Sequence, residues 1–195
     1  QPCLELLVYY GAETGCGLTA GWAERDGDRI YNAASCFDAT GRKLAHYRKI
    51  QLFGPMEQSV FTFGDQYTVF QLGPHRAALL ICYDVEFAHH GHALAAQGVD
   101  LLLVPTANAT GFEMVPDLLV PARAYETGMT IAYANYCGSD NGLAFGGRSV
   151  LAGPDGVPLA KAGRGACLLI ADLSQVADID QSLLSTQKTD RRDLP

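Results

Sequence analysis

The stretch Arg76-Ala77-Ala78-Leu79-Leu80-Ile81-Cys82-Tyr83-Asp84 decides the fold. Its first part is a short apolar run, which is typical of a strand buried on both faces. The run ends at Cys82, and a mixed segment over 86–97 is predicted to be helical. Cys82 is therefore expected at a strand-to-helix junction, beside the free N–H groups of a helix start. Such a position favours an anion, so we expect the pKa of the thiol to be lowered.

Lys49 and Glu57 supply the partners that a reactive thiol needs. A buried cysteine is more often inert than reactive, so Cys82 on its own indicates little. Lys49 lies at the end of a second predicted strand, and Glu57 follows in a turn-rich stretch that could fold back over the same sheet edge. A cation can hold the thiolate and then an oxyanion, and a carboxylate can move or orient protons. These residue types are sufficient for attack on an amide, although their spacing leaves open whether they meet.

The segments around these residues resemble the signatures of the nitrilase superfamily of carbon–nitrogen hydrolases. The lysine motif reads Tyr47-Arg48-Lys49-Ile50-Gln51-Leu52-Phe53-Gly54. The cysteine motif reads Leu80-Ile81-Cys82-Tyr83-Asp84-Val85-Glu86-Phe87, followed by Asp100-Leu101-Leu102-Leu103-Val104-Pro105-Thr106-Ala107-Asn108. Supporting matches are Gly21-Trp22-Ala23-Glu24-Arg25, Tyr31-Asn32-Ala33, Ala122-Arg123-Ala124-Tyr125-Glu126 and Ala134-Asn135-Tyr136. The resemblance therefore covers essentially the whole chain.

The resemblance implies a role for each candidate residue. Cys82 matches the family nucleophile, Lys49 the catalytic lysine, and Glu57 a second, structural or assisting glutamate. Lys49 and the backbone N–H of Tyr83 would stabilise the developing negative charge. Asn108 lies at the end of a predicted strand, where it is a candidate substrate contact.

One departure from the family pattern bears on mechanism and on fold. The family's general-base glutamate lies upstream of the lysine, usually in a Pro-Glu pair, and this chain contains no such pair. Glu24 matches an ordinary surface position instead. We therefore expect an α/β fold, the αββα two-sheet sandwich of nitrilase type, without its first strand, first helix and base. Residues 1–195 would form one N-terminally incomplete domain, whose tail over 178–195 reaches a partner subunit in a homodimer or higher homo-oligomer.

Composition indicates an enzyme domain without affinity for nucleic acid or membranes. The net charge of -7 argues against a grip on nucleic acid or on an anionic membrane surface. No apolar run approaches the roughly 20 residues that cross a bilayer, and the N-terminus lacks a signal-peptide layout. The six cysteines show no metal-type spacing and no disulfide framework, which favours a reduced, cytoplasmic chain. We expect no cofactor and no metal.

Turn residues and apolar periodicity divide the chain into short strands and a few helices. Strands are predicted near 17–23, 29–38, 42–49, 67–72, 76–82, 100–105, 129–136, 147–152, 157–161 and 166–172. Helices are predicted near 4–14, 86–97 and 116–127. The glycine-containing stretch at 138–142 is predicted to be a loop.

Two further clusters are interpreted as structural. His89, His90 and His92 form a small group that zinc would use only with further ligands at matching geometry, so a solvated helix face is the better interpretation. Arg123 and Glu126 stand at i,i+3 on a predicted helix, where a structural ion pair is expected.

The sequence thus predicts a hydrolase that cleaves non-peptide C–N bonds, converting a small amide to an acid plus ammonia through a thioester on Cys82. A small nitrile is the other substrate class that the resemblance allows. Because the base is expected to be absent, the chain as given should be weak or inactive. The alternative is a non-catalytic scaffold or binding subunit that keeps the same fold.

Overall fold

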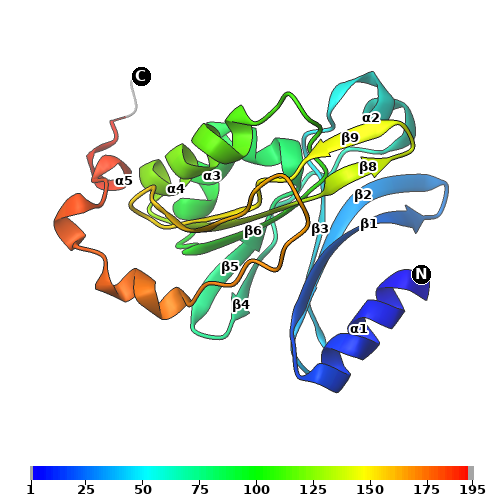
Figure 1. The fold of residues 1–195 in the computed structure, drawn as a ribbon, viewed down its shortest axis with the longest axis horizontal. Coiled ribbons are helices and arrows are strands. Elements are labelled where there is room, and N and C mark those ends of the chain that lie inside the picture. The colour runs from blue at the N-terminus through cyan, green and yellow to red at the C-terminus, as the bar shows by residue number, and fades with distance from the viewer. Residues whose placement is uncertain (1, 193–195) are drawn as a thin grey trace.

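The computed structural model describes residues 2–192, whose strands form two main sheets that face each other (Figure 1). The smaller sheet has the order β1-β2-β3, the larger has the order β11-β10-β7-β6-β5-β4, and β8 and β9 form a separate hairpin. The strands are β1 Leu18–Asp26, β2 Arg29–Phe37, β3 Lys43–Arg48, β4 Val69–Leu72, β5 His75–Leu79, β6 Leu101–Thr106, β7 Thr130–Asn135, β8 Cys137–Asp140, β9 Leu143–Gly146, β10 Val150–Ala152 and β11 Pro158–Lys161.

Helices lie outside the two sheets (Figure 1). The helix α1 packs beside β1, while α3 and α4 cover the outer face of the larger sheet. The α-helices are α1 Pro2–Thr14, α2 Gly54–Val60, α3 Ala88–Ala95, α4 Val120–Thr127 and α5 Gln187–Asp190. Shorter turns of helix are the 3₁₀ segments η1 Cys82–Glu86, η3 Leu173–Asp178 and η4 Gln181–Leu183, and the π-helical η2 Val115–Leu119. The predicted arrangement of two facing sheets with helices outside is confirmed.

The centre of the larger sheet is parallel, and this parallel arrangement determines where the site lies. β5 pairs with β6, and β6 with β7, in register and in the same direction. The connections between them run through α3 and α4, as parallel strands require. The apolar run ending at Ile81 is buried, as predicted. The carboxyl ends of β5, β6 and β7 therefore meet at one edge, which is where ligands bind in sheets of this kind.

The smaller sheet is an antiparallel meander with tight turns. β1 and β2 pair over their full length, from Leu18 with Phe37 to Asp26 with Arg29. This register leaves two residues in the turn. Gly27 adopts a φ of +58°, a conformation that is unfavourable for a β-branched residue. β3 pairs with β2 alone within this sheet, so β3 is an edge strand there.

Several predicted boundaries differ from the structure. The strand expected over 76–82 ends at Leu79, because Cys82 already begins η1. The helix expected over 116–127 starts as a π-helix and becomes α4 only at Val120. The loop expected at 138–142 is wrong over 138–140, which belong to β8, and only Asn141 and Gly142, both with positive φ, form the turn of the β8–β9 hairpin.

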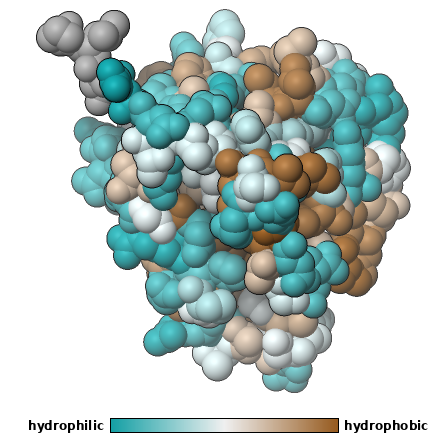
Figure 2. Space-filling model, turned by 90° about the vertical axis from the view of Figure 1, so that its left-hand side faces the viewer, coloured by the Kyte–Doolittle hydropathy of each residue, from teal (hydrophilic) through white to brown (hydrophobic). Residues whose placement is uncertain are grey.

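The strand predicted over 166–172 is wrong within the described residues. This segment pairs with none of the described strands, so its extended backbone has no ladder partner. Its side chains still alternate: Cys167 and Leu169 line an apolar cleft against the larger sheet, whereas Leu168 and Ile170 are 85% and 76% exposed. Hydrophobic residues also gather toward one side of the face drawn in Figure 2. The sequence pattern was that of a strand, but a strand also needs a neighbour.

The C-terminal segment runs beside the larger sheet's helices. Its last described helix, α5, packs against α4. Residues 193–195 of the predicted tail lie outside the described residues, and the expected contact with a partner subunit stays a prediction. None of the helices over residues 2–192 combines the length and apolar character needed to span a bilayer.

Candidate active site

Cys82 stands on a sharp turn at the end of the buried β5 segment. It is the first residue of η1, and its φ of +48° lies in the left-handed region. For a residue with a side chain that region costs about 1–3 kcal/mol, and the conformation persists only where the surrounding structure holds it. The buried residues Leu80 and Ile81 immediately before it supply that support. The turn places the thiol in a cavity at the carboxyl edge of the larger sheet.

Lys49 reaches the same cavity from the smaller sheet, just after β3. Its side chain is only 1% exposed, and its Nζ donates to both carboxylate oxygens of Glu57, at 3.0 and 2.7 Å. Glu57 lies on α2, which folds back over the sheet edge as predicted. It also accepts hydrogen bonds from the backbone N–H of Phe53 at 2.6 Å and from Asn32 Nδ2 at 3.1 Å. The carboxylate therefore accepts four hydrogen bonds from three donor groups.

The cavity has a volume of about 490 Å³ and brings the three predicted catalytic residues together. Its wall comes from α1, β1, β2, α2 and the carboxyl ends of the larger sheet's parallel strands. The lining residues are Leu7, Thr19, Ala20, Gly21, Trp22, Ala23, Asn32, Lys49, Glu57, Phe61, Ile81, Cys82, Pro105, Thr106, Ala107, Ala134, Asn135 and Tyr136. Among residues 2–192, Glu57 is the only carboxylate in this lining.

The expected lowering of the Cys82 pKa is wrong. Burial raises the pKa of the thiol, because the thiolate would lose its hydration. The ammonium group of Lys49 and a hydrogen bond from the Ala107 backbone lower the pKa of Cys82 without outweighing burial. Lys49 is the strongest of the groups that lower the pKa of Cys82.

Asp84 ties the nucleophile-bearing turn to the lysine-bearing segment. Its buried carboxylate accepts hydrogen bonds from Ile81 N at 3.0 Å and from Gln51 N at 2.7 Å. The hydroxyl of Tyr47 donates a third hydrogen bond at 2.8 Å. Burial raises the pKa of Asp84 to about 6, although the three hydrogen-bond donors lower it. One side chain thus fixes both halves of the site relative to each other.

The backbone N–H of Tyr83, the predicted oxyanion donor, lies in the first turn of η1. It precedes the first hydrogen bond of η1, which runs from Asp84 N to Ile81 O at 3.1 Å, so it has no partner within that helix. The Tyr83 ring packs edge-to-face on Phe53 and Phe87, with centroids 5.1 and 4.8 Å away. This packing fixes the position of Tyr83 at the start of η1, and its predicted role as an oxyanion donor stays a prediction.

Asn108 lies beside the cavity rather than in its lining. Its Nδ2 donates to the hydroxyl of Tyr133 at 3.2 Å, and its backbone N–H donates to Asn135 Oδ1 at 2.7 Å. The two preceding residues, Thr106 and Ala107, do line the cavity. The structure therefore shows Asn108 holding the loop after β6, while its predicted contact with substrate stays a prediction.

The chain matches the family described as carbon–nitrogen hydrolase over residues 2–180. A Pseudomonas protegens protein, described as a hydrolase in the pqqF 5′ region, is 37% identical over 98% of this chain and 68% of its own length. The chain belongs to the carbon–nitrogen hydrolase family. An (R)-stereoselective amidase from a Pseudomonas species is 32% identical over 91% of this chain and 63% of that protein.

Solved structures of an amidase from a Nesterenkonia species share the fold. One such structure superposes with a TM-score of 0.87 and 39% identity, covering 97% of this chain and 69% of that chain. A variant of the same amidase has acrylamide joined to its active-site cysteine by Michael addition. The chain thus spans about two thirds of the length of these carbon–nitrogen hydrolases.

The other polar clusters of this carbon–nitrogen hydrolase have structural partners. His90 is only 3% exposed, so the expectation of a solvated histidine face is wrong for this residue. Its Nε2 contacts Gln51 Nε2 at 3.0 Å and its Nδ1 contacts the Tyr67 hydroxyl at 2.6 Å. Burial lowers the pKa of His90 to about 4. The predicted ion pair between Arg123 and Glu126 is confirmed at 2.9 Å.

Sequence reasoning missed three residues of the site. Asp84 lies within the cysteine motif, and a carboxylate soon after a buried apolar run must find buried donors, which is the signal that indicates its role. Asn32 lies within one of the family matches, and it binds Glu57. Glu24, expected at an ordinary surface position, has a side chain only 14% exposed and binds Arg48 and His46. No local sequence signal predicts the partners of Asn32 and Glu24, because these partners lie on other elements of the fold.

Proposed function

We propose that the chain carries out the acylation half of amide hydrolysis through Cys82. The observation that supports this most directly is the convergence of Cys82 and Lys49, from two different sheets, on one cavity. The Cys82 sulfur would bond to the carbonyl carbon of a small amide while the oxygen becomes an oxyanion. Lys49 and the Tyr83 N–H would stabilise that oxyanion, and each such donor is commonly worth about 10²–10³ in rate.

The collapse of this intermediate breaks the carbon–nitrogen bond. The thiol proton passes to the departing nitrogen, ammonia leaves, and a thioester on Cys82 remains. Water must then attack the thioester to release the acid and restore the thiol. That step needs a base, and Glu57, whose carboxylate already accepts four hydrogen bonds, is poorly suited to accept a proton. We therefore expect fast acylation and slow turnover.

The test is a time course of ammonia release from a simple amide, combined with intact-mass measurement. The expected result is a burst of up to one ammonia per chain, then slow release, with an acyl mass added at Cys82. Cys82→Ala should show neither burst nor adduct. Absence of both in the wild-type chain, with amide concentrations well above any binding constant, would contradict the proposal.

The filled carboxylate of Glu57 also supports a second candidate, a non-catalytic scaffold or binding subunit with the same fold. In that case the chain would bind an amide without forming a thioester. Calorimetric binding of an amide together with no mass adduct on Cys82 would favour this candidate. Nitrile and carbamoyl compounds, run beside the amide, would decide among the substrate classes.

The remaining expectations concern assembly and location. A homodimer or higher homo-oligomer, and residence in the cytoplasm, are proposals that follow from the family resemblance and the cysteine spacing. Light scattering coupled to size exclusion gives the mass in solution, and a monomer at high concentration would contradict the first. A chain found outside the cytoplasm on fractionation of the source cells would contradict the second.

A further inference from the structure

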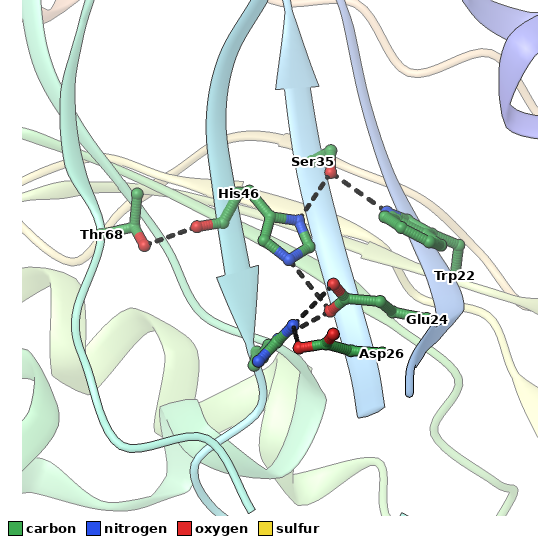
Figure 3. Close-up of polar contacts among 7 residues, drawn as sticks. Trp22, Glu24, Asp26, Ser35, His46 and Thr68 are labelled. Carbon is green, nitrogen blue, oxygen red and sulfur yellow. Dashed lines mark hydrogen bonds and ion pairs between the residues drawn. The ribbon is translucent and has the colours of Figure 1, made fainter. Parts of the chain in front are cut away.

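A network of polar side chains covers the outer face of the smaller sheet, opposite to the face that carries Tyr47 and the core (Figure 3). Its centre is Glu24 on β1. Arg48 of β3 donates to both oxygens of Glu24, each at 2.8 Å, and also to Asp26 Oδ2 at 2.8 Å. His46 of β3 places Nε2 3.0 Å from Glu24 Oε2. One carboxylate thus links β1 to β3 across the intervening strand.

The same network continues to the tryptophan of β1. Ser35 Oγ lies 3.1 Å from His46 Nδ1 and accepts a hydrogen bond from Trp22 Nε1 at 3.1 Å. With His46 protonated on Nε2 alone, every donor in this chain of contacts has an acceptor: Trp22 to Ser35, Ser35 to His46, His46 to Glu24. The order resembles a Ser-His-Glu triad, but Ser35 is 0% exposed and its oxygen is already occupied. We therefore assign it no nucleophilic role.

The network ends at the residue immediately before Lys49. Successive residues of a strand point to opposite faces, so Arg48 on the outer face and Lys49 in the cavity share one short piece of backbone. Only one strand of the smaller sheet flanks β3. Beyond the strand end, the backbone of Lys49 is held by two hydrogen bonds, from its N–H to Asn32 O at 2.8 Å and to its carbonyl from Gly64 N at 2.8 Å.

We propose that Glu24 is a positioning residue for Lys49. By accepting hydrogen bonds from the Arg48 guanidinium on both of its oxygens, Glu24 fixes the position of the lysine ammonium relative to the Cys82 thiol. The Arg48 guanidinium is also stacked over the Tyr31 ring, 3.8 Å from its centroid, so its plane is fixed from two sides. A bidentate Arg–carboxylate pair has a defined geometry that a single hydrogen bond lacks. This inference rests on the proposed role of Lys49 and Cys82.

The charge of Glu24 itself would act in the opposite direction to its positioning role. Through space, removing a negative charge stabilises a thiolate and lowers the pKa of Cys82. If Glu24 instead holds Lys49 in place, Glu24→Gln moves the ammonium and raises that pKa. The sign of the change therefore separates positioning from simple electrostatics.

The experiment measures the pH dependence of iodoacetamide labelling at Cys82, by peptide mass spectrometry on the full chain. Glu24→Gln and Arg48→Lys are the test variants. The first removes the charge of Glu24, and the second keeps the positive charge but loses the two parallel hydrogen bonds of the guanidinium. Both should shift the labelling midpoint upward, and a shift of one pKa unit lowers the thiolate fraction about tenfold at neutral pH. The double variant should add little to either, since the two residues act as one pair.

Asp28→Asn is the matched control, because Asp28 is an exposed carboxylate in the turn after β1. It removes one negative charge from the same strand pair, and its labelling midpoint should stay unchanged. Fluorescence of Trp22, the chain's single tryptophan, reports whether each variant is folded and whether the network is disturbed. Circular dichroism at the labelling temperature identifies variants that have unfolded, and these are excluded. If Glu24→Gln is unfolded, the labelling midpoint of Arg48→Lys alone tests the proposal.

The outcomes separate two kinds of failure. If the Lys49→Met variant has the same labelling midpoint at Cys82 as the wild-type chain, the proposed function itself fails. If Lys49→Met shifts the midpoint but Glu24→Gln and Arg48→Lys, both folded, do not shift it upward, only the positioning role of Glu24 is overturned.

Discussion

Cys82 and Lys49 reach one cavity from two sheets that hold them in different ways. The larger sheet supports Cys82 by apolar burial, since Leu79, Leu80 and Ile81 are all at most 4% exposed. Lys49 is instead held by charge, through Glu57 of α2 in the cavity and through Arg48 with its partners on the outer face of the smaller sheet. Apolar packing is insensitive to salt and pH, whereas ion pairs depend on both. The two halves of the site should therefore fail under different conditions.

Removing the Glu57 charge should give the largest loss of stability on the lysine side. Glu57→Gln leaves the Lys49 ammonium, 1% exposed, without its ion-pair partner. Breaking a buried pair in this way typically costs about 3–5 kcal/mol. Urea unfolding followed by fluorescence measures the loss.

The double variant Lys49→Met/Glu57→Met is the control for this prediction. It removes both charges, and replacing a buried pair by apolar groups is often close to neutral. It should therefore recover most of the stability that Glu57→Gln loses. A double variant as unstable as the single one would show that shape, not charge, holds this region.

On the cysteine side, Leu80→Ala should destabilise the chain by about 2–5 kcal/mol, because it leaves a cavity in a fully buried strand. The loss should be the same at low and high salt. Urea unfolding at both salt concentrations is the measurement. A loss that depends strongly on salt would contradict the account of this half as purely apolar.

The residues that join the two halves should respond to pH in opposite directions. The pKa of Asp84 is about 6, raised from 3.8 by burial, so between these values the folded chain binds more protons there than the unfolded chain. Stability from Asp84 therefore falls as the pH rises through this window. The pKa of His90 is about 4, lowered from 6.5 by burial, so its contribution rises with pH over a similar window.

Variants expose these opposing slopes. Relative to Asp84→Asn, the wild-type chain should lose on the order of 3 kcal/mol between about pH 4 and pH 6, the equivalent of two pKa units. Relative to His90→Gln, it should gain a similar amount up to about pH 6.5. Unfolding free energies at several pH values give both slopes. Two slopes of the same sign would overturn the assignment of these groups.

Salt should have the smallest effect, and it should act on the outer network. The Arg48 side chain is 31% exposed, so its pair with Glu24 is partly screened. We expect the stability difference between wild type and Glu24→Gln to shrink by less than about 1 kcal/mol from low to molar salt. Unfolding at the two salt concentrations measures it, and a difference that grows with salt would contradict an ionic origin.

The sequence could predict the apolar half of the site far better than the polar half. The buried run before Cys82 has a local pattern, so its strand and the junction after it were found. The motif around Lys49 also indicated Glu57 as a candidate partner, although the spacing left open whether the two side chains meet. By contrast, the pKa of Cys82 was predicted in the wrong direction, because the helix start was weighed without the burial that opposes it.

Other misses have the same cause, which is that the partners come from distant strands. Glu24 meets Arg48 only because β1, β2 and β3 pair in one particular register. Asp84 meets Gln51 only because two sheet ends converge. The segment at 166–172 shows the reverse case, since its strand pattern is clear but no described strand pairs with it.

The most direct test of the central claim is the labelling midpoint of Cys82 in wild type, Lys49→Met and the double variant Lys49→Met/Glu57→Met. If Lys49 sustains the thiolate, both variants should raise the midpoint, the double one by less than Lys49→Met alone, since Lys49 lowers the pKa of this thiol more than Glu57 raises it. A midpoint that stays in place, or falls, in both variants would contradict the assignment of Cys82 and Lys49 as a working pair.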